Sequence, residues 1–136
     1  MSEHLNFLPF AALPKVPRGN GIVNYLIATG KVGARAMHTG ISELPVGVAA
    51  PRHSHNSEEQ VTILQGRVKI TLGDREQVCE RFDSTFISPG VEHELVNVGD
   101  DTAYVMVVYG SANVNRTFAA TGETVGIGSE GDRFIG

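Results

Sequence analysis

The sequence predicts a small all-β domain, and three observations lead to this fold class. Short runs rich in Val, Ile, Thr, Tyr and Phe recur at close intervals, and Gly, Pro, Asn and Asp separate them. No long stretch shows the periodicity of an amphipathic helix. The 136 residues include sixteen glycines, six prolines and no tryptophan, which suits a turn-rich barrel or sandwich. A chain of this length supports one hydrophobic core, so we expect a single domain over residues 1–136.

The first segment, residues 1–21, is predicted to be an arm that precedes the barrel. Five large apolar residues and three prolines lie in it: Leu5, Phe7, Leu8, Phe10, Leu13, Pro9, Pro14 and Pro17. Proline has no N–H to donate, so a regular helix or a central strand is disfavoured here. The apolar side chains need a surface to cover them, and a small barrel offers too little. We therefore expect a homodimer.

The barrel is predicted to span residues 22–110 as a series of short strands. The expected strands are 22–29, 33–44, 49–55, 59–64, 67–72, 77–82, 85–88, 94–98 and 102–109. The sequences Gly73-Asp74 and Gly99-Asp100-Asp101 are typical of hairpin turns. Both alternating faces of the last strand are apolar, which predicts a strand covered on both sides, at a sheet or dimer interface. Residues 111–136 form a Gly-rich tail that is expected to be a draped loop or disordered.

Charge and composition exclude several classes of partner. The formal net charge is −4 and the basic residues do not cluster, so neither nucleic acid nor an anionic membrane is expected to bind. The apolar stretch near the N-terminus carries Glu3 and lacks a basic leader, and no run approaches membrane-spanning length, which predicts a cytoplasmic protein. The single Cys79 excludes an intramolecular disulfide, and we expect a small buried or edge residue there.

Three histidines and a glutamate form a candidate metal site. His53 and His55 are two residues apart, so on an extended strand both imidazoles point to the same face and can reach one ion. Glu59 follows a predicted turn and is an even number of residues away from both histidines, as a residue on the same face would be. A later strand supplies His93. Imidazoles with one carboxylate suit a single divalent transition metal ion: iron, manganese, nickel, cobalt or zinc. An octahedral ion held in this way keeps positions open to water or substrate.

The spacing of these residues resembles the first motif of the cupin superfamily, Gly-x5-His-x-His-x3-Glu-x6-Gly. The chain matches this motif at every position from Gly47 to Gly66. Glu58 and Gln60 are rival oxygen donors beside Glu59, but counting from His55 or back from Gly66 selects Glu59 as the ligand. Glu58 and Gln60 are then expected to point outward or to support the site.

The second cupin motif, Gly-x5-Pro-x-Gly-x2-His-x3-Asn, is matched less completely. Gly90, His93 and Asn97 are in place, whereas Phe82 stands where the family has glycine and Ser88 where it has proline. The resemblance implies a double-stranded β-helix, or jelly-roll, barrel that holds one metal ion inside. It also implies that the four ligands are His53, His55, Glu59 and His93.

Several reactions stay open, because cupins host many chemistries on the same ligands. The leading hypothesis is a dioxygenase that acts on a small oxygen-rich organic molecule bound to the metal through two oxygens. The first alternative is a redox-neutral lyase or isomerase that acts on a sugar acid or keto acid, with His38 or Glu58 as the candidate base. The second is a ligand-binding cupin without turnover. Strand register decides which side chains line the cavity, and the candidates are Tyr25, Arg35, Met37, His38, Tyr104 and Met106.

Overall fold

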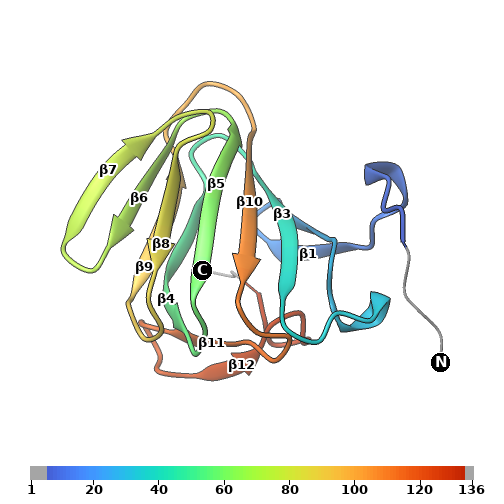
Figure 1. Ribbon diagram of the computed structural model, residues 1–136. Helices are drawn as coiled ribbons and strands as arrows, with labels where there is room; N and C mark the ends of the chain where they lie inside the picture. Colours follow the sequence, from blue (N-terminus) through green and yellow to red (C-terminus); the bar gives the residue numbers. More distant parts are fainter. Residues whose placement is uncertain (1–5, 134–136) are drawn as a thin grey trace.

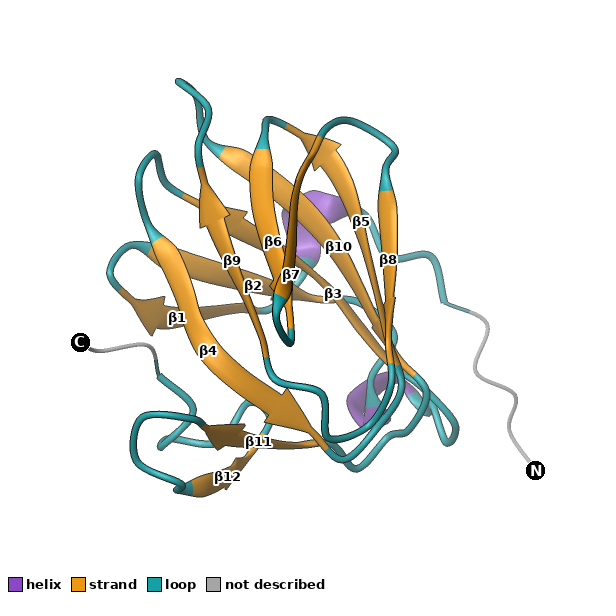
Figure 2. Ribbon diagram, turned by 90° about the vertical axis from the view of Figure 1, so that its left-hand side faces the viewer, coloured by secondary structure: helices purple, strands orange, loops and turns teal. Residues whose placement is uncertain are grey.

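The computed structural model describes residues 6–133, and its strands form two antiparallel sheets that face each other (Figures 1 and 2). One sheet has the strand order β1-β2-β3-β10-β5-β8, and the other has the order β12-β11-β4-β9-β6-β7. The elements in chain order are η1 (Phe10–Ala12), β1 (Lys15–Gly19), β2 (Ile22–Leu26), η2 (Gly30–Val32), β3 (His38–Leu44), β4 (Ala49–His55), β5 (Glu59–Gln65), β6 (Val68–Leu72), β7 (Arg75–Cys79), β8 (Ser84–Ile87), β9 (His93–Asn97), β10 (Ala103–Tyr109), β11 (Asn115–Phe118) and β12 (Thr124–Gly126).

The hydrophobic core lies between the inner faces of the two sheets. Strand alternation builds it, since every second side chain of a strand points to the same face. Val61 and Ile63 of β5 and Val105 of β10 are fully buried on one inner face, and Val68 of β6 is fully buried on the other. The predicted all-β jelly-roll barrel is confirmed. No helix within residues 6–133 is long and apolar enough to cross a membrane.

Strand β1 lies inside the segment that the sequence predicts to be an arm. It is an edge strand, and its ladder with β2 is interrupted between Pro17 and Gly19. An edge position and a bulge are where a sheet tolerates proline. The arm therefore contributes a strand to the barrel. Of its predicted apolar residues, Leu5 lies outside the described residues.

Two further strands, β11 and β12, lie in the segment predicted to be a draped loop or disordered. That expectation is wrong for residues 115–118 and 124–126. β11 pairs with β4 and β12 pairs with β11, so both extend the second sheet and run across one end of the barrel (bottom of Figures 1 and 2). The prediction failed because the backbone of β4 offers a free edge, which local composition cannot reveal.

The remaining strands agree with the prediction apart from three shifts, one of which is that the predicted strand 33–44 begins only at His38. The segment predicted as strand 77–82 pairs instead from Arg75, opposite Leu72, because Gly73-Asp74 is a two-residue hairpin turn. A turn over residues 80–83 ends the strand, where the Asp83 carboxylate accepts the Glu80 backbone amide at 2.8 Å. The predicted strand 22–29 stops at Leu26 and is followed by the single turn η2. Cys79 is a buried free thiol, as expected.

Candidate metal centre

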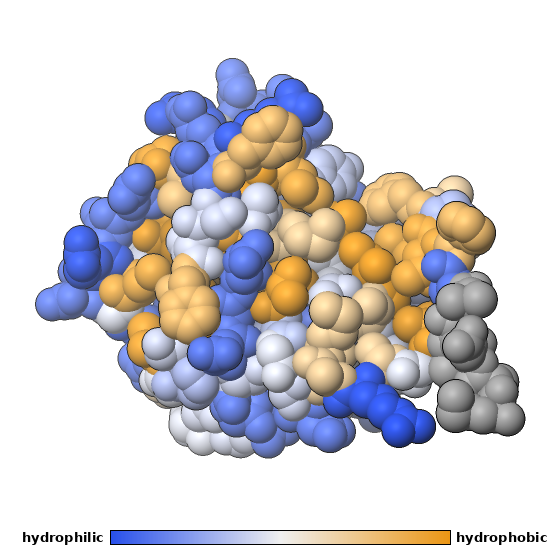
Figure 3. Space-filling model, in the orientation of Figure 1, coloured by the Kyte–Doolittle hydropathy of each residue, from blue (hydrophilic) through white to orange (hydrophobic). Residues whose placement is uncertain are grey.

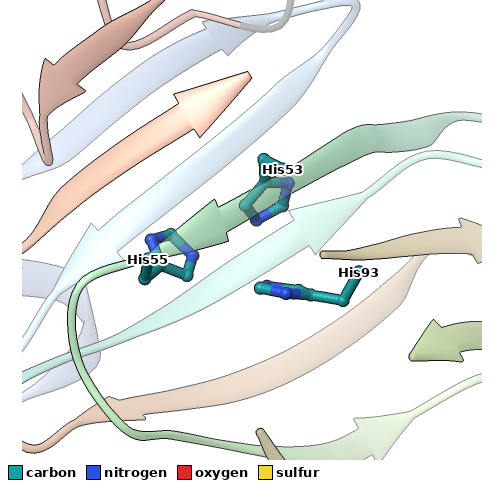
Figure 4. A group of neighbouring side chains, drawn as sticks. All are labelled: His53, His55 and His93. Atoms are coloured by element: carbon teal, nitrogen blue, oxygen red, sulfur yellow. The ribbon is translucent and has the colours of Figure 1, made fainter. Parts of the chain in front are cut away.

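Strand alternation and register bring three imidazoles together. His53 and His55 lie on the inner face of β4, and both are buried. His93 begins β9, is fully buried and pairs directly with His53 across the ladder, so the two side chains share a face. One ring nitrogen from each of the three residues lies within 4.8 Å of the others. Figure 4 shows the three rings converging from the two neighbouring strands.

The facing sheet supplies a carboxylate. Glu59 is the first residue of β5 and is 4% exposed. Its Oε1 lies 3.0 Å from Nε2 of His93 and 3.5 Å from Nε2 of His55. The rival donors Glu58 and Gln60 are exposed. The structure thus brings together the four residues that the sequence predicts as ligands, and it turns the neighbouring carboxylate away from them.

Backbone carbonyls fix the protonation of all three histidines. The Nδ1 atom of His53 lies 2.6 Å from the carbonyl oxygen of Pro51. In the same way, Nδ1 of His55 lies 3.0 Å from the Asn115 carbonyl, and Nδ1 of His93 lies 2.8 Å from the Val91 carbonyl. A carbonyl oxygen only accepts, so each Nδ1 carries the proton and donates it. The lone pair of each neutral ring is then on Nε2. Such support orients a metal-binding histidine and raises its basicity.

Two buried atoms at the centre lack aligned hydrogen bonds. Oε1 of Glu59 and Nε2 of His93 are close to each other, yet neither has a hydrogen-bond partner of acceptable geometry. Buried polar atoms are nearly always satisfied, so this pair calls for a further partner. Glu59 and His93 would satisfy both atoms by holding a cation. The donor set of imidazole nitrogens and one carboxylate oxygen fits a divalent transition metal ion.

Burial controls the protonation of the metal-free site. It lowers the pKa of His53 well below the usual range, and the neighbouring His93 and His55 lower it further. Burial also lowers the pKa of His55, although Glu59 opposes this. For His93 burial acts in the same direction, but the Glu59 carboxylate and the Val91 carbonyl outweigh it, so its pKa is raised. Protons therefore compete with a metal ion more strongly at His93 than at the other two histidines.

Tyr109 is a buried neighbour of the site that the sequence did not single out. Its hydroxyl lies 3.3 Å from Nε2 of His55, and its Cα pairs with that of Glu59 on one side and His38 on the other. Burial raises the pKa of Tyr109 far above its usual value, so the phenol stays protonated. The alternation of β10, in which Ala103, Val105, Val107 and Tyr109 share one face, is the sequence signal that points to it.

The candidate base His38 faces the same interior as Tyr109, with the two ring centroids 5.9 Å apart. Burial lowers its pKa, so the ring is neutral at pH 7. Its Cα is separated from Glu59 by strand β10. His38 therefore lies beside the centre rather than in it, whereas the other candidate, Glu58, is exposed.

Most of the predicted cavity-lining residues lie elsewhere. Tyr25, Tyr104 and Met106 are on the outer face of their sheet, opposite in parity to the buried Val105, so the prediction is wrong for them. The hydroxyls of Tyr25 and Tyr104 both donate to Glu43 there. Arg35 and Met37 precede β3 and are exposed. The pairing register of the strands decides which face each side chain takes, and no local sequence pattern determines that register.

Open space lies on two sides of the ligands. A cavity of about 40 Å³ is lined by His53 and Glu59 together with core residues such as Val61 and Val107. A larger cleft of about 550 Å³ lies between β7 and β8, the edge strands on the side seen in Figure 2. Its lining includes Leu72 and Ile87, which are the cross-strand partners of His93 and Glu59. The cleft thus reaches the immediate neighbours of two ligands.

Residues of the second motif hold the strands around the site through hydrogen bonds to backbone carbonyls. The Gly90 amide donates to the His55 carbonyl at 2.8 Å, which ties the loop before β9 to the end of β4. Asn97 is buried, and its side chain donates to the carbonyls of Leu44 and Asp101 at 2.9 and 2.8 Å. Asn97 therefore joins strands and does not face the metal ligands.

Comparison with known proteins agrees with this geometry. The family model of the cupin domain matches residues 40–109, which is just over half of the chain. No functionally curated protein matches the chain.

Solved structures with low sequence identity share the fold. An RmlC-like cupin from Shewanella frigidimarina has 17% identity and a TM-score of 0.70, over 82% of this chain and 93% of that protein. The polyketide cyclase RemF from Streptomyces resistomycificus has 16% identity and a TM-score of 0.72, over 94% and 89%. A sugar phosphate isomerase of the cupin superfamily from Silicibacter pomeroyi has 15% identity and a TM-score of 0.71, over 96% and 97%. With the first motif, the barrel and the matching family model in place, the chain belongs to the cupin family.

Proposed function

We propose that this cupin is a metal-dependent enzyme that acts on a small oxygen-rich organic molecule, and that the reaction is a dioxygenation. One observation carries the metal dependence. Three buried imidazoles, each held by a backbone carbonyl, bring one ring nitrogen apiece within 4.8 Å of the others, and the Glu59 carboxylate lies 3.5 Å from Nε2 of His55 and 3.0 Å from that of His93. This arrangement has no counterpart in an ordinary apolar core, where such groups would be costly.

The four side chains would hold one ion and leave part of its surroundings free. A transition metal held by them would supply Lewis acidity toward substrate oxygens. The residues of this chain do the rest. His53, His55 and His93 present neutral Nε2 donors in fixed directions, and Glu59 reduces the local positive charge. Apolar neighbours such as Val61 and Val107 exclude water from the far side.

The shape of the open space supports a small substrate. A cleft of about 550 Å³ falls within the range that accommodates small organic ligands. Its lining mixes apolar residues, among them Leu72 and Val91, with polar ones such as Thr85 and Ser88. A molecule with two vicinal oxygens, such as a diol, catechol, diketone or α-hydroxy acid, suits such a lining and the predicted open positions.

A redox-neutral lyase or isomerase acting on a sugar acid or keto acid is the second candidate. The observation that favours it is the pair of proton-transfer groups beside the ligands, the Tyr109 hydroxyl at 3.3 Å from His55 and the neutral ring of His38 next to it. A protonated phenol can donate to a developing enolate oxygen, and a neutral imidazole can accept a proton. Such groups are not needed for oxygen chemistry.

Metal analysis tests the first part of the proposal. Wild-type protein should bind one ion per chain. Glu59→Ala should weaken zinc binding by more than about 100-fold, since losing a direct ligand should exceed the 10- to 100-fold cost of losing a supporting residue. Glu58→Gln is the matched control, because it changes the adjacent exposed carboxylate and should leave affinity unchanged. Equal effects of the two substitutions would contradict the ligand assignment.

Oxygen consumption tests the reaction. Iron-loaded protein should consume dioxygen with at least one member of a panel of diols, catechols, diketones and α-hydroxy acids, and Glu59→Ala should abolish it. Flat oxygen-electrode traces together with zinc- or manganese-dependent turnover of a sugar acid would replace the dioxygenase by the redox-neutral enzyme. If nothing turns over while a panel member still raises the melting temperature, a ligand-binding cupin remains.

A further inference from the structure

A buried cluster of two arginines and one aspartate lies next to the metal centre, and neither the ligand set nor the barrel requires it. Arg18 comes from β1, Arg116 from β11, and Asp132 from the segment after β12. Nη1 of Arg116 lies 2.6 Å from Oδ1 of Asp132. Nη2 of Arg18 bonds the same oxygen, and its Nε bonds the Asp132 carbonyl. The side chains of Arg18 and Asp132 are at most 1% exposed.

Strand register places this cluster beside the ligands. Arg116 is the direct cross-strand partner of His55, so their side chains share the inner face of the sheet. The residue before it, Asn115, supplies the carbonyl that holds His55 Nδ1. On the other side a cavity of about 30 Å³ is lined by Arg18, Tyr109 and His38, and Tyr109 contacts His55. Arg116 therefore lies directly beside His55, and Arg18 shares a small cavity with the Tyr109 that contacts His55.

The aspartate is contributed by a short strap, residues 127–133, that follows the three-residue edge strand β12. Within the described residues, the Ile127 amide of the strap donates to the Val114 carbonyl, whereas the amides of Ser129, Asp132 and Arg133 donate to carbonyls close by in the chain, at Gly126, Ser129 and Gly131. Oδ2 of Asp132 accepts the Gly128 amide at 2.8 Å. The residues on either side of Asp132 are exposed. Asp132 is thus the buried anchor of an otherwise superficial segment.

Stability alone does not account for such a cluster. Burying charges costs desolvation energy that their attraction returns only in part, and an apolar set of the same volume often serves as well. Two guanidinium groups that converge on one carboxylate form, however, a site for carboxylates, since each offers a planar fork of donors. In this structure the carboxylate comes from the chain itself, from a strap whose other residues from Gly128 to Arg133 are exposed.

We infer that Arg18 and Arg116 form an anion subsite for a carboxylate of the substrate, and that Asp132 fills this subsite until the substrate displaces it. The inference rests on the proposed function, because it takes the metal centre as the place where the substrate binds. It narrows the substrate to a small organic acid that carries metal-binding oxygens and a separate carboxylate for the arginine pair. The strap then opens when the acid binds and covers the site when the acid leaves.

Hydrogen exchange of zinc-loaded wild-type protein tests the displacement without turnover. Malonate is the probe and malonamide is its uncharged control. Malonate should speed exchange of the Gly128 amide by tenfold or more in a saturable way, because that amide loses the Asp132 carboxylate, and malonamide should not. Malonate that binds the metal but leaves Gly128 protection unchanged would overturn the inference. So would an absence of malonate binding.

Calorimetric titration of a variant provides the second measurement. Asp132→Ala removes the internal competitor, so zinc-loaded variant should bind malonate at least tenfold more tightly than wild type, and adding Arg116→Met should abolish the gain. Glu92→Ala is the matched control, since it removes the carboxylate of the exposed Arg52 pair, and its affinity should equal that of wild type. Equal affinity of Asp132→Ala and wild type would overturn the inference.

Zinc content of the same samples separates the two proposals. Stoichiometric zinc with unchanged Gly128 protection overturns the anion subsite and leaves the metal-dependent function intact. Protein that binds no zinc overturns the proposed function itself. If Asp132→Ala does not fold, the exchange measurement on wild-type protein decides alone.

Discussion

The three imidazoles of the candidate centre differ in how readily they take up a proton. All three are nevertheless buried, and each donates a hydrogen bond from Nδ1–H to a backbone carbonyl. The difference comes from Glu59, whose Oε1 lies closer to His93 than to His55. For His53, burial dominates the pKa and lowers it. One residue therefore links metal binding to pH more strongly than the other two.

Metal affinity should fall as the pH drops, and His93 should set where the fall begins. The pKa of His93 is raised above 6.5 in the metal-free protein, whereas those of His53 and His55 are lowered below it. Below the raised pKa of His93, metal binding then displaces one proton from that ring, and affinity should decrease about tenfold for each further pH unit. Zinc titrations against a competing chelator measure this slope. A slope of two protons, or a fall that begins only below pH 6.5, would contradict it.

Phe82 occupies a position where glycine is the favoured residue. Its φ is 74°, in the left-handed region, at the place where the second cupin motif has glycine. A non-glycine residue there costs about 1 kcal/mol. Phe82 is 70% exposed, so its side chain adds little packing energy to offset this cost. The Arg81 guanidinium lies 4.8 Å from the centre of its ring.

Replacing Phe82 should therefore reveal this strain. Phe82→Gly and Phe82→Ala lose the same ring contacts, but only glycine relieves the backbone. The glycine variant should be more stable than the alanine variant by about 1 kcal/mol in urea unfolding. Equal midpoints for the two variants would show that the turn is not strained.

The hairpin turns around β6 show how backbone geometry and neighbours combine. Gly66, between β5 and β6, has φ of +95°, and a Cβ there would lie 3.0 Å from Cβ of Ala103 and 3.1 Å from its Cα. Gly73, between β6 and β7, has φ of +61° with nothing within 4 Å. Both turns need the left-handed conformation, but only the first is crowded.

Alanine substitutions separate the two effects. Gly73→Ala should cost about 1 kcal/mol of unfolding free energy, which is the conformational term alone. Gly66→Ala should cost clearly more, about 3 kcal/mol, since the backbone of β10 has to move as well. Thermal or urea unfolding of both variants measures the difference. Similar losses of unfolding free energy in the two variants would mean that the backbone of β10 moves away from residue 66 at little cost.

The arm gives the molecule an uncovered apolar surface. Phe7 is 99% exposed and Phe10 is 50% exposed, with the Phe10 ring 4.6 Å from that of Tyr25. A groove of about 240 Å³ runs between the arm and the chain near η2, lined by residues such as Leu13 and Val32. Figure 3 shows apolar side chains gathered on this side, at the right of the view. The homodimer stays a prediction, and this surface is where we expect it to form.

Light scattering at micromolar concentration should give the mass of a dimer. Phe7→Ser with Phe10→Ser should raise the dissociation constant about tenfold or more, since burying one large apolar side chain is worth about 1.5–3 kcal/mol. Phe86→Ser is the control, because Phe86 is 62% exposed on β8, away from the arm. A monomeric wild type, or equal weakening by the control, would reject the arm as the interface.

Much of the fold could be predicted because its signals are local. Strands β4 and β5 begin where the alternation of apolar residues and the turn at residues 56–58 place them, and Gly73-Asp74 makes the predicted hairpin. Strands β1, β11 and β12 could not be predicted. All three lie at or next to the edge of a sheet: β1 and β12 are short edge strands that pair only with the strand next to them in the chain, and β11 pairs with the distant β4.

The sequence by itself determined His53, His55 and Glu59, because parity on one strand and a fixed spacing to the next are properties of neighbouring positions, and the resemblance to the second cupin motif added His93. Only the tertiary structure decided what surrounds them. Tyr109 and Arg116 face His55, and Asp132 reaches the site from the chain end, because sheet register and strand order bring distant segments together. Those contacts depend on long-range pairing, which leaves no mark in local sequence.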